Sequence, residues 1–286
     1  MNLKKLSSVV LSCIFAGSIF TGCGGDTAPS IPKSQTGIIT KLNESEQTFN
    51  EHSNKLEETV KIPNVNLMHN YHYYKDLKSM LAALESKQIN EISTYRSVAN
   101  YLVSQNPKLE ILPHSIGMND SFCLAVRKED EPLRDALNFA IHTMKDNDTI
   151  SYIAKTYIAY LNPNDKAPVT DMPKIEGSET VKVGVTGDLP PFDLVLEDGT
   201  PAGFSTRMLE EISRIIGKNI EIVKISSDER ATALTSKKID IAFWVTVPSE
   251  NLKESGNVPE KVDVPADLEI SAPYYKDEIV HIALKK

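Results

Sequence analysis

Two short segments of the chain share one pattern and lie 150 positions apart. Leu81–Asn90 reads LAALESKQIN, and Ala231–Asp240 reads ATALTSKKID. Each segment ends a helix, makes a tight turn through Ser-Lys and opens a strand at an Ile. A repeated unit of this kind predicts two similar α/β lobes, in each of which helices cover a sheet. The other interpretation is a chance similarity of two helix ends.

The hydrophobic pattern around these segments alternates between strand and helix periods. It predicts strands at 64–69, 122–126, 181–185, 220–225, 239–245 and 279–284. It predicts helices at 46–58, 74–85, 131–144, 149–161 and 204–216. Asn43 and Glu46 resemble a capping box at the first helix, and Gly217 is a natural left-handed cap of the last.

The N-terminus has the pattern of an export signal. Lys4 and Lys5 precede an apolar run, 6–20, that is too short and too rich in Ser and Gly for a membrane span. The run ends in Phe-Thr-Gly-Cys, which resembles the bacterial lipobox, where a peptidase cuts before a lipid-modified cysteine. We expect residues 1–22 to be a signal peptide and acylated Cys23 to anchor the chain to the outer face of the cell membrane. The alternative is an ordinary secretory signal with Cys23 as a free thiol.

The charge and the cysteine content exclude a nucleic-acid-binding protein and a protein stabilised by an intramolecular disulfide. Loss of Lys4 and Lys5 takes the formal net charge from −8 to −10, and no basic stripe for nucleic acid is present. With Cys13 cleaved off and Cys23 acylated, only Cys123 remains, so an intramolecular disulfide is not possible. We expect Cys123 to be a small buried hydrophobe.

Two polar, Pro-containing stretches divide the mature chain. Residues 23–36 read as a flexible tether, and 162–179 as a Pro-rich linker. They leave a first block at 37–161 and a second block at 180–286. A mature chain of this length can form two lobes with their own cores.

The second block carries short motifs in a characteristic order. They are VKVGV at 181–185, LPPF at 189–192, EDG at 197–199, GF at 203–204, the repeated unit, and SAPYY at 271–275. In this order and spacing they resemble the first lobe of bacterial extracellular solute-binding proteins, the polar amino-acid group of ABC-transporter receptors. The first block resembles the second lobe and closing helices of that family through 81–90, 97–102, 122–128 and 148–157.

The lobes stand in inverted order relative to the family. The resemblance therefore implies a circular permutation, opened near the hinge, with the old ends joined through 162–179. In that case the start of the first block should lie near 284–286. The alternative is two truncated halves that pair with other chains. The implied fold is α/β and two-lobed, periplasmic-binding-protein-like, each lobe a mixed sheet flanked by helices.

The resemblance implies a receptor, not an enzyme, that closes its lobes around a small polar solute for the permease subunits of an ABC importer. It implies a monomer without cofactor or metal. The cleft residues that it implies are Thr186, Asp188, Phe192, Trp244, Thr246 and Asn251 from one lobe, and Asn43 and Tyr95 from the other.

The sequence departs from the family where amino acids are held. Asn251 stands where the family's Arg clamps the ligand carboxylate, and Tyr95 stands where an acidic residue holds the ammonium. Trp244 replaces a small polar residue, either to stack on a ligand or as a core aromatic. Arg230 could compensate for the missing Arg, although a surface helix position is the expectation. We therefore expect common α-amino acids to bind weakly.

Two other readings remain open at this point. One is a sensor or a degenerate binding lipoprotein without transport, and the other is a cleft enzyme that uses Asp188 or Glu250 as its acid. His69 and His72 lack a Cys or carboxylate at ligand spacing, so they predict a polar loop or strand end and no metal site.

Overall fold

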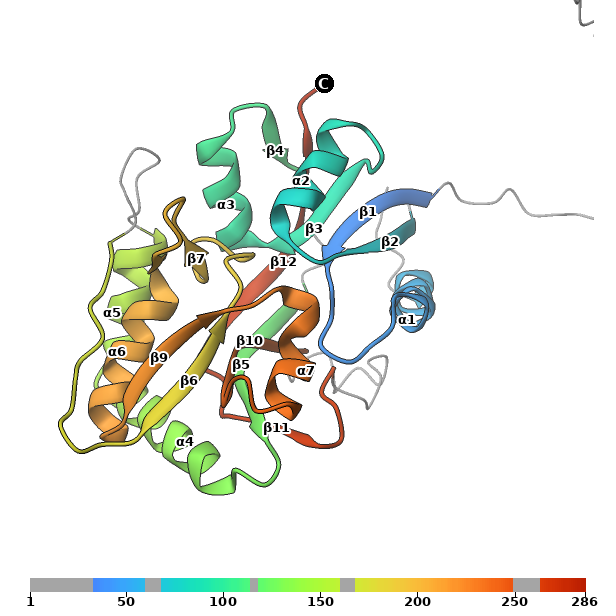
Figure 1. The fold of residues 1–286 in the computed structure, drawn as a ribbon. Helices are drawn as coiled ribbons and strands as arrows, with labels where there is room; N and C mark the ends of the chain where they lie inside the picture. The colour runs from blue at the N-terminus through green and yellow to red at the C-terminus, as the bar shows by residue number, and fades with distance from the viewer. Residues whose placement is uncertain (1–32, 60–67, 114–117, 160–167, 249–262) are drawn as a thin grey trace, which may run out of the picture. The chain divides into compact units, whose positions relative to one another are not determined.

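The computed structural model describes residues 33–59, 68–113, 118–159, 168–248 and 263–286 (Figure 1). Its strands are β1 (Lys33–Ile39), β2 (Met68–Tyr74), β3 (Glu91–Tyr95), β4 (Leu109–Ile111), β5 (Asn119–Arg127), β6 (Thr180–Val185), β7 (Leu194–Val195), β8 (Pro201–Ala202), β9 (Asn219–Lys224), β10 (Ile241–Pro248), β11 (Leu268–Ile270) and β12 (Tyr275–Leu284). Its α-helices are α1 (Glu46–Thr59), α2 (Leu77–Glu85), α3 (Arg96–Gln105), α4 (Glu131–Asp146), α5 (Thr149–Ala154), α6 (Phe204–Ile216) and α7 (Arg230–Thr235). Cys23, Glu250 and Asn251 lie outside the described residues.

Two half-sheets with the same strand order are joined by two crossing strands. The first runs β2-β1-β3-β12 and the second β9-β6-β10-β5, with parallel pairs except at the crossing strands β12 and β5. Strand β12 pairs with β5 through Tyr275–Glu278 and with β3 through Ile279–Ala283. We call the half-sheet of β1–β3 with α1–α3 lobe 1, and that of β6, β9 and β10 with α4–α7 lobe 2. The α/β, two-lobed fold expected from the sequence is confirmed.

The repeated segment adopts the same turn in both lobes. The turn after α2 passes through Lys87 and the turn after α7 through Lys237, and both residues have φ 61°. Positive φ is uncommon for a residue with a side chain, so its occurrence at matching positions is a strong sign of one repeated design.

The residue that follows each turn joins the next strand to the first strand of its lobe. Asn90 donates its N–H to the Gln35 carbonyl at 2.7 Å and accepts the Gln35 N–H at 2.9 Å through its side chain. Asp240 makes the same pair of contacts with Lys182, also at 2.7 and 2.9 Å. A chance similarity of two helix ends would not reproduce these contacts.

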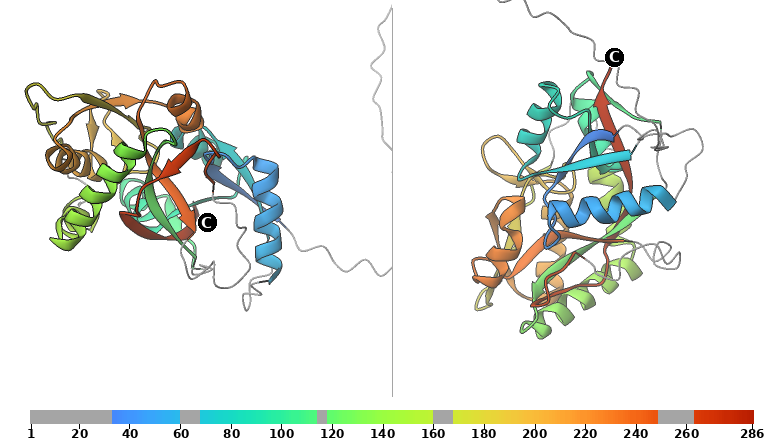
Figure 2. Two further views of the ribbon diagram at one scale, coloured as in Figure 1. Left: turned by 90° about the horizontal axis from the view of Figure 1, so that it is seen from below. Right: turned by 90° about the vertical axis from the view of Figure 1, so that its right-hand side faces the viewer.

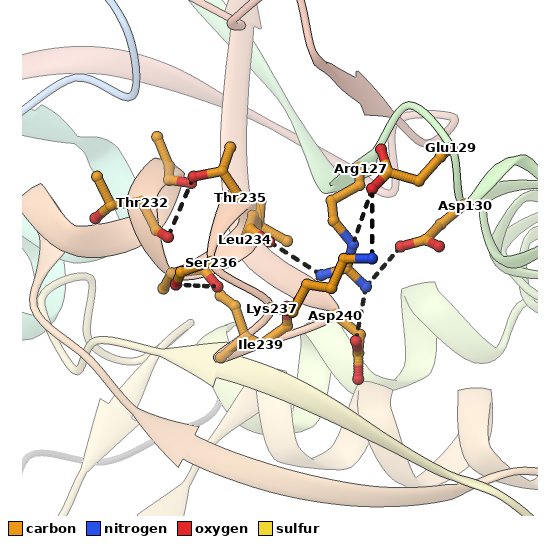
Figure 3. A network of polar contacts seen from close by, with 12 residues as sticks. Arg127, Glu129, Asp130, Thr232, Leu234, Thr235, Ser236, Lys237, Ile239 and Asp240 are labelled. Carbon is orange, nitrogen blue, oxygen red and sulfur yellow. Dashed lines mark hydrogen bonds and ion pairs between the residues drawn. The ribbon is translucent and has the colours of Figure 1, made fainter.

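Crossing strand β5 is fixed to lobe 2 by a buried arginine (Figure 3). Arg127 donates to the Leu234 carbonyl at 3.0 Å and the Ile239 carbonyl at 2.7 Å. It also lies 2.8 Å from Asp240 and 2.6 Å from Asp130. One side chain from the first block thus satisfies the carbonyls of the repeated turn in the second block.

The closing helices of the first block pack on lobe 2. Helices α4 and α5 contact α6, as Figure 1 shows. A π-helical turn, Lys155–Ala159, continues α5. The described part of the predicted linker, 168–179, has no helix or strand, and Asn219 holds it by contacts of 2.7 and 3.0 Å with the backbone of Ile175.

Helix α1 lies beside β2 at the edge of lobe 1 (Figure 2). Its N-cap is Ser45, whose hydroxyl accepts the Thr48 N–H at 3.1 Å, so the capping box expected at Asn43 is wrong. In the described part of the chain, no helix has the length and apolar composition of a membrane span.

Several boundaries differ from the sequence expectation. Strand β1 begins at Lys33, inside the stretch assigned to the tether, because Ser34 and Thr36 turn into the lobe and are buried. Helix α2 begins at Leu77 and not at Tyr74, because the Asp76 side chain accepts the Ser79 N–H at 2.7 Å and caps it. The first residues of the strand expected at 64–69 lie outside the described residues.

Candidate functional site

A pocket of about 180 Å³ is lined by residues of both lobes. Ten of its lining residues are apolar or aromatic, and the other twelve are polar or charged. The apolar and aromatic residues are Ile38, Ile39, Phe49, Tyr71, Tyr95, Met118, Leu189, Trp244, Pro248 and Ile279.

Trp244 forms one side of this pocket from a distorted point in β10. The pairing of β10 with β5 shifts register between Ala242 and Val245, and Trp244 has φ 43°. Its indole nitrogen lies 2.9 Å from an Asp193 carboxylate oxygen and 3.1 Å from the Thr186 hydroxyl. The bulge therefore re-aims the ring toward the pocket while its N–H is satisfied inside lobe 2.

Arg230 covers the Trp244 ring and is buried, so the expectation of a surface helix position is wrong. Its guanidinium carbon lies 3.8 Å from the ring centroid. Its nitrogens donate to the carbonyls of Ser227 at 2.9 Å, Trp244 at 3.0 Å and, across the lobes, Thr40 at 2.8 Å. Burial lowers the pKa of Arg230 to about 10, against the opposing effect of nearby carboxylates.

Asp188 joins the lobes beside the pocket but is not part of its lining. One carboxylate oxygen accepts the Leu77 N–H of lobe 1 at 2.9 Å, and the other accepts the Ser227 hydroxyl at 2.5 Å. Burial raises the pKa of Asp188 to about 6, and Asp193 adds to that effect. Both oxygens already have partners, which leaves Asp188 poorly placed as a cleft acid.

Of the other residues expected in the cleft, some line the pocket, Phe192 lies in the core and Asn43 lies in a loop. Tyr95 and Thr246 line the pocket, and the Tyr95 hydroxyl donates to Asp120 at 2.7 Å. Phe192 is fully buried and stacks on Phe122, with ring centroids 5.1 Å apart, so it lies in the core.

The Asn43 backbone N–H donates to Asp263 at 2.5 Å. The carboxylate of Asp263 also accepts the N–H groups of Leu42 at 2.6 Å and Glu44 at 2.8 Å. Through these three contacts Asp263, which follows β10 in sequence, holds the 42–44 loop of lobe 1.

Each charged residue of the wall has a partner within the protein. Glu44 pairs with His52 at 2.5 Å, and Lys41 lies 5.1 Å from the Phe49 ring centroid. Glu57 accepts the Tyr71 hydroxyl at 3.2 Å. The charges of Arg230, Asp120 and Asp263 are engaged as described above. A charged ligand group would therefore have to displace an existing contact.

The wall residues that the sequence did not assign to the pocket include Arg230, which was expected on the surface, and Asp263. The repeat carried a signal for the first of them. Arg230 stands 150 positions after Met80, which is buried in the core of lobe 1, so the repeat assigns Arg230 to an interior position. Asp263 lies in a polar stretch between Pro259 and Pro265, and this composition is typical of a surface loop.

Comparisons with known proteins point to one family. Residues 181–254 match the model of "Bacterial extracellular solute-binding proteins, family 3". A Chlamydia trachomatis protein described as "Probable ABC transporter arginine-binding protein ArtJ" is 29% identical over 134 residues, which cover 46% of this chain and 47% of the relative. The chain thus aligns with about half of that relative's length.

Two solved structures are similar at low sequence identity. The ligand-binding component of an ABC-type import system from Staphylococcus aureus has 12% identity and a TM-score of 0.41, with 88% of this chain and 66% of that chain covered. A periplasmic substrate-binding protein of an ABC transporter from Coxiella burnetii has 10% identity and a TM-score of 0.37, with 88% and 84% covered. The strand order of the two half-sheets shows the fold independently of these similarities. Through residues 181–254, the chain is similar to the family 3 bacterial extracellular solute-binding proteins, which confirms the resemblance found in the second block of the sequence.

Proposed function

We propose that this chain is a membrane-anchored, extracytoplasmic solute-binding protein that captures a small solute between its lobes for an ABC importer. The observation that carries the proposal is the pocket lined by both lobes, with Tyr95 from lobe 1 and Trp244 from lobe 2. A solute in that position favours the closed arrangement, because it gains contacts with both lobes only when they meet.

The proposed ligand is weakly charged and carries an apolar or aromatic group. Ten of the lining residues are apolar or aromatic, and the charged side chains of the wall are already paired within the protein. Arg230 is engaged with three carbonyls and the Trp244 ring, which weakens the case for it as a carboxylate clamp. The alternative is arginine, which the name of the Chlamydia relative suggests.

The circular permutation is part of the proposal. The register of lobe 1 sets Thr36 of β1 and Ala283 of β12 on either side of Glu91. Two strand spacings amount to roughly 10 Å, a distance that a short connection can bridge. The packing of α4 and α5 on α6 also supports this topology, since these helices follow lobe 1 in sequence but cover lobe 2.

The anchor rests on the sequence. We propose that Cys23 is acylated after cleavage of residues 1–22, and that Cys23→Ala releases the protein from the membrane fraction. Intact-mass analysis of the purified protein tests this. A mature chain that begins elsewhere and carries no lipid would refute the anchor without affecting the pocket.

Thermal-shift screening of the full-length chain with small solutes tests the receptor function, because a ligand of the folded state raises the melting temperature. We expect a saturable shift for at least one uncharged or aromatic solute. Turnover of a bound solute that disappears in Asp188→Asn would instead favour the enzyme reading.

A further inference from the structure

Three ionisable side chains meet on one face of the lobe 1 sheet, on strands that are far apart in sequence. His69 lies on β2, Glu91 on β3 and His281 on β12. Each offers one ligand atom, and these atoms all lie within 4.8 Å of one another. The three residues are 5%, 2% and 4% exposed, respectively. Water therefore contributes little to the solvation of this cluster.

A second carboxylate holds His69 from the opposite side. Nδ1 of His69 lies 2.7 Å from Glu57 of α1, and Nε2 lies 3.1 Å from Glu91. The Glu57 carboxylate also accepts the backbone N–H of His69 at 2.9 Å. Glu57 thus fixes the ring by Nδ1 and turns Nε2 toward Glu91. Metal-bound histidines have this arrangement, with a carboxylate on the nitrogen that does not bind the metal.

Glu91 is positioned in the same way. The Thr36 hydroxyl of β1 donates to its Oε1 at 2.9 Å. The rings of His69 and His281 lie with centroids 4.5 Å apart at 26°, so the two imidazoles share one side of the cluster. The three side chains of the cluster and the two that orient them come from four adjacent strands and one helix. Such elements hold a site more rigidly than a loop does.

We propose that His69, Glu91 and His281 form a binding site for one divalent transition-metal ion, oriented by Glu57. Two imidazoles and a carboxylate form a donor set that zinc and its neighbours accept. The two carboxylates that hold His69, buried Glu91 and half-buried Glu57, would also balance the charge of a divalent cation. Glu57 is shared with the pocket wall, so the metal site adjoins the proposed solute site without being part of it.

Zinc titration of the full-length, detergent-solubilised chain tests the site. After chelator treatment, we expect uptake of one Zn²⁺ per chain by calorimetry and a cobalt-substituted form with the visible absorption of a low-coordinate Co²⁺ site. His69→Asn and Glu91→Gln should lower zinc affinity at least 100-fold. Glu57→Gln should lower it by about 10- to 100-fold, the usual effect of removing a partner that orients a ligand.

His72→Asn is the matched control, because His72 lies on the same strand and is half-exposed. Its affinity for zinc should equal that of the wild type. Circular dichroism establishes which variants fold. If His69→Asn and Glu91→Gln do not fold, the zinc affinity of Glu57→Gln decides whether the site exists. Failure of the wild type to bind zinc overturns the site, as does zinc binding that Glu57→Gln leaves unchanged while His72→Asn weakens it. Neither result bears on solute binding in the pocket.

Discussion

Arg230 is a buried cation with three carbonyl partners, at a position where the other lobe has Met80. Arg230→Met should fit the space but leave the carbonyls of Ser227, Trp244 and Thr40 without their donor. Each hydrogen bond to a charged group is worth about 1.5–3 kcal/mol, but the variant also avoids the cost of burying a guanidinium, so we expect the free energy of unfolding to fall by a net of about 2–3 kcal/mol. Urea unfolding measures this. An unchanged midpoint would mean that the three contacts do not stabilise the folded protein.

Asp188 gives a pH dependence with a definite sign. Its pKa is raised by burial from an ordinary value near 3.8 to about 6, so the folded state holds the proton more tightly than the unfolded state. This contribution to stability is complete below about pH 4 and is lost as the pH rises through about 6.

Asp188→Asn keeps an acceptor for the Leu77 N–H and removes the titration. The variant should gain roughly 2–3 kcal/mol of stability relative to wild type between pH 4 and pH 7. Unfolding curves of both proteins at several pH values provide the test. A difference that does not depend on pH would contradict the assignment.

At the scale of elements, the crossing strand β5 is held to lobe 2 by Arg127. Arg127→Ala should destabilise the fold by roughly 3–5 kcal/mol, because it leaves buried carbonyls and the Asp240 carboxylate without their partner. Lys237→Ala is the control at the same turn. Lys237 is exposed and lies 3.9 Å from Glu129, so its loss should change stability by less than about 0.5 kcal/mol. Equal effects of both variants in chemical denaturation would refute this role of Arg127.

Local patterns predicted the elements better than the site. The apolar face of α6 and its Gly217 cap, with φ 66°, follow the sequence closely, because helix period and cap are local properties. The bulge that turns Trp244 toward the pocket depends on how β10 pairs with β5, a strand that lies more than 100 residues away. No local pattern carries that register.

The histidine cluster likewise could not be predicted from local sequence patterns. No Cys or carboxylate completes a ligand set near His69 in the sequence, so the local pattern predicts no metal site. In the fold its neighbours are Glu91 and His281, which lie on strands brought together only by the order β2-β1-β3-β12. Likewise, the alternation of β2 could not show that Glu57, on a polar helix, faces His69.

At the scale of the whole molecule, the proposed permutation can be reversed. A chain that begins at 168, runs to Lys286, continues through a short flexible linker to Lys33 and ends at 159 should fold with similar stability. The reason is that the C-terminal end of β12 and the N-terminal end of β1 lie at the same edge of lobe 1. Circular dichroism and urea unfolding report the result. A chain that aggregates or unfolds without cooperativity would argue that the present order is required.

The most direct test of the account is a fluorescence titration, because Trp244 is the single tryptophan of the chain and lines the pocket. The twenty amino acids and a panel of small uncharged and aromatic solutes should be added to the full-length protein. Without the family's Arg and acidic clamp, zwitterionic amino acids should bind roughly two to four powers of ten more weakly than a clamped ligand. We predict a saturable change in Trp244 emission with an uncharged or aromatic solute. Micromolar binding of arginine or another common amino acid by calorimetry, with Trp244 emission unchanged, would contradict the account.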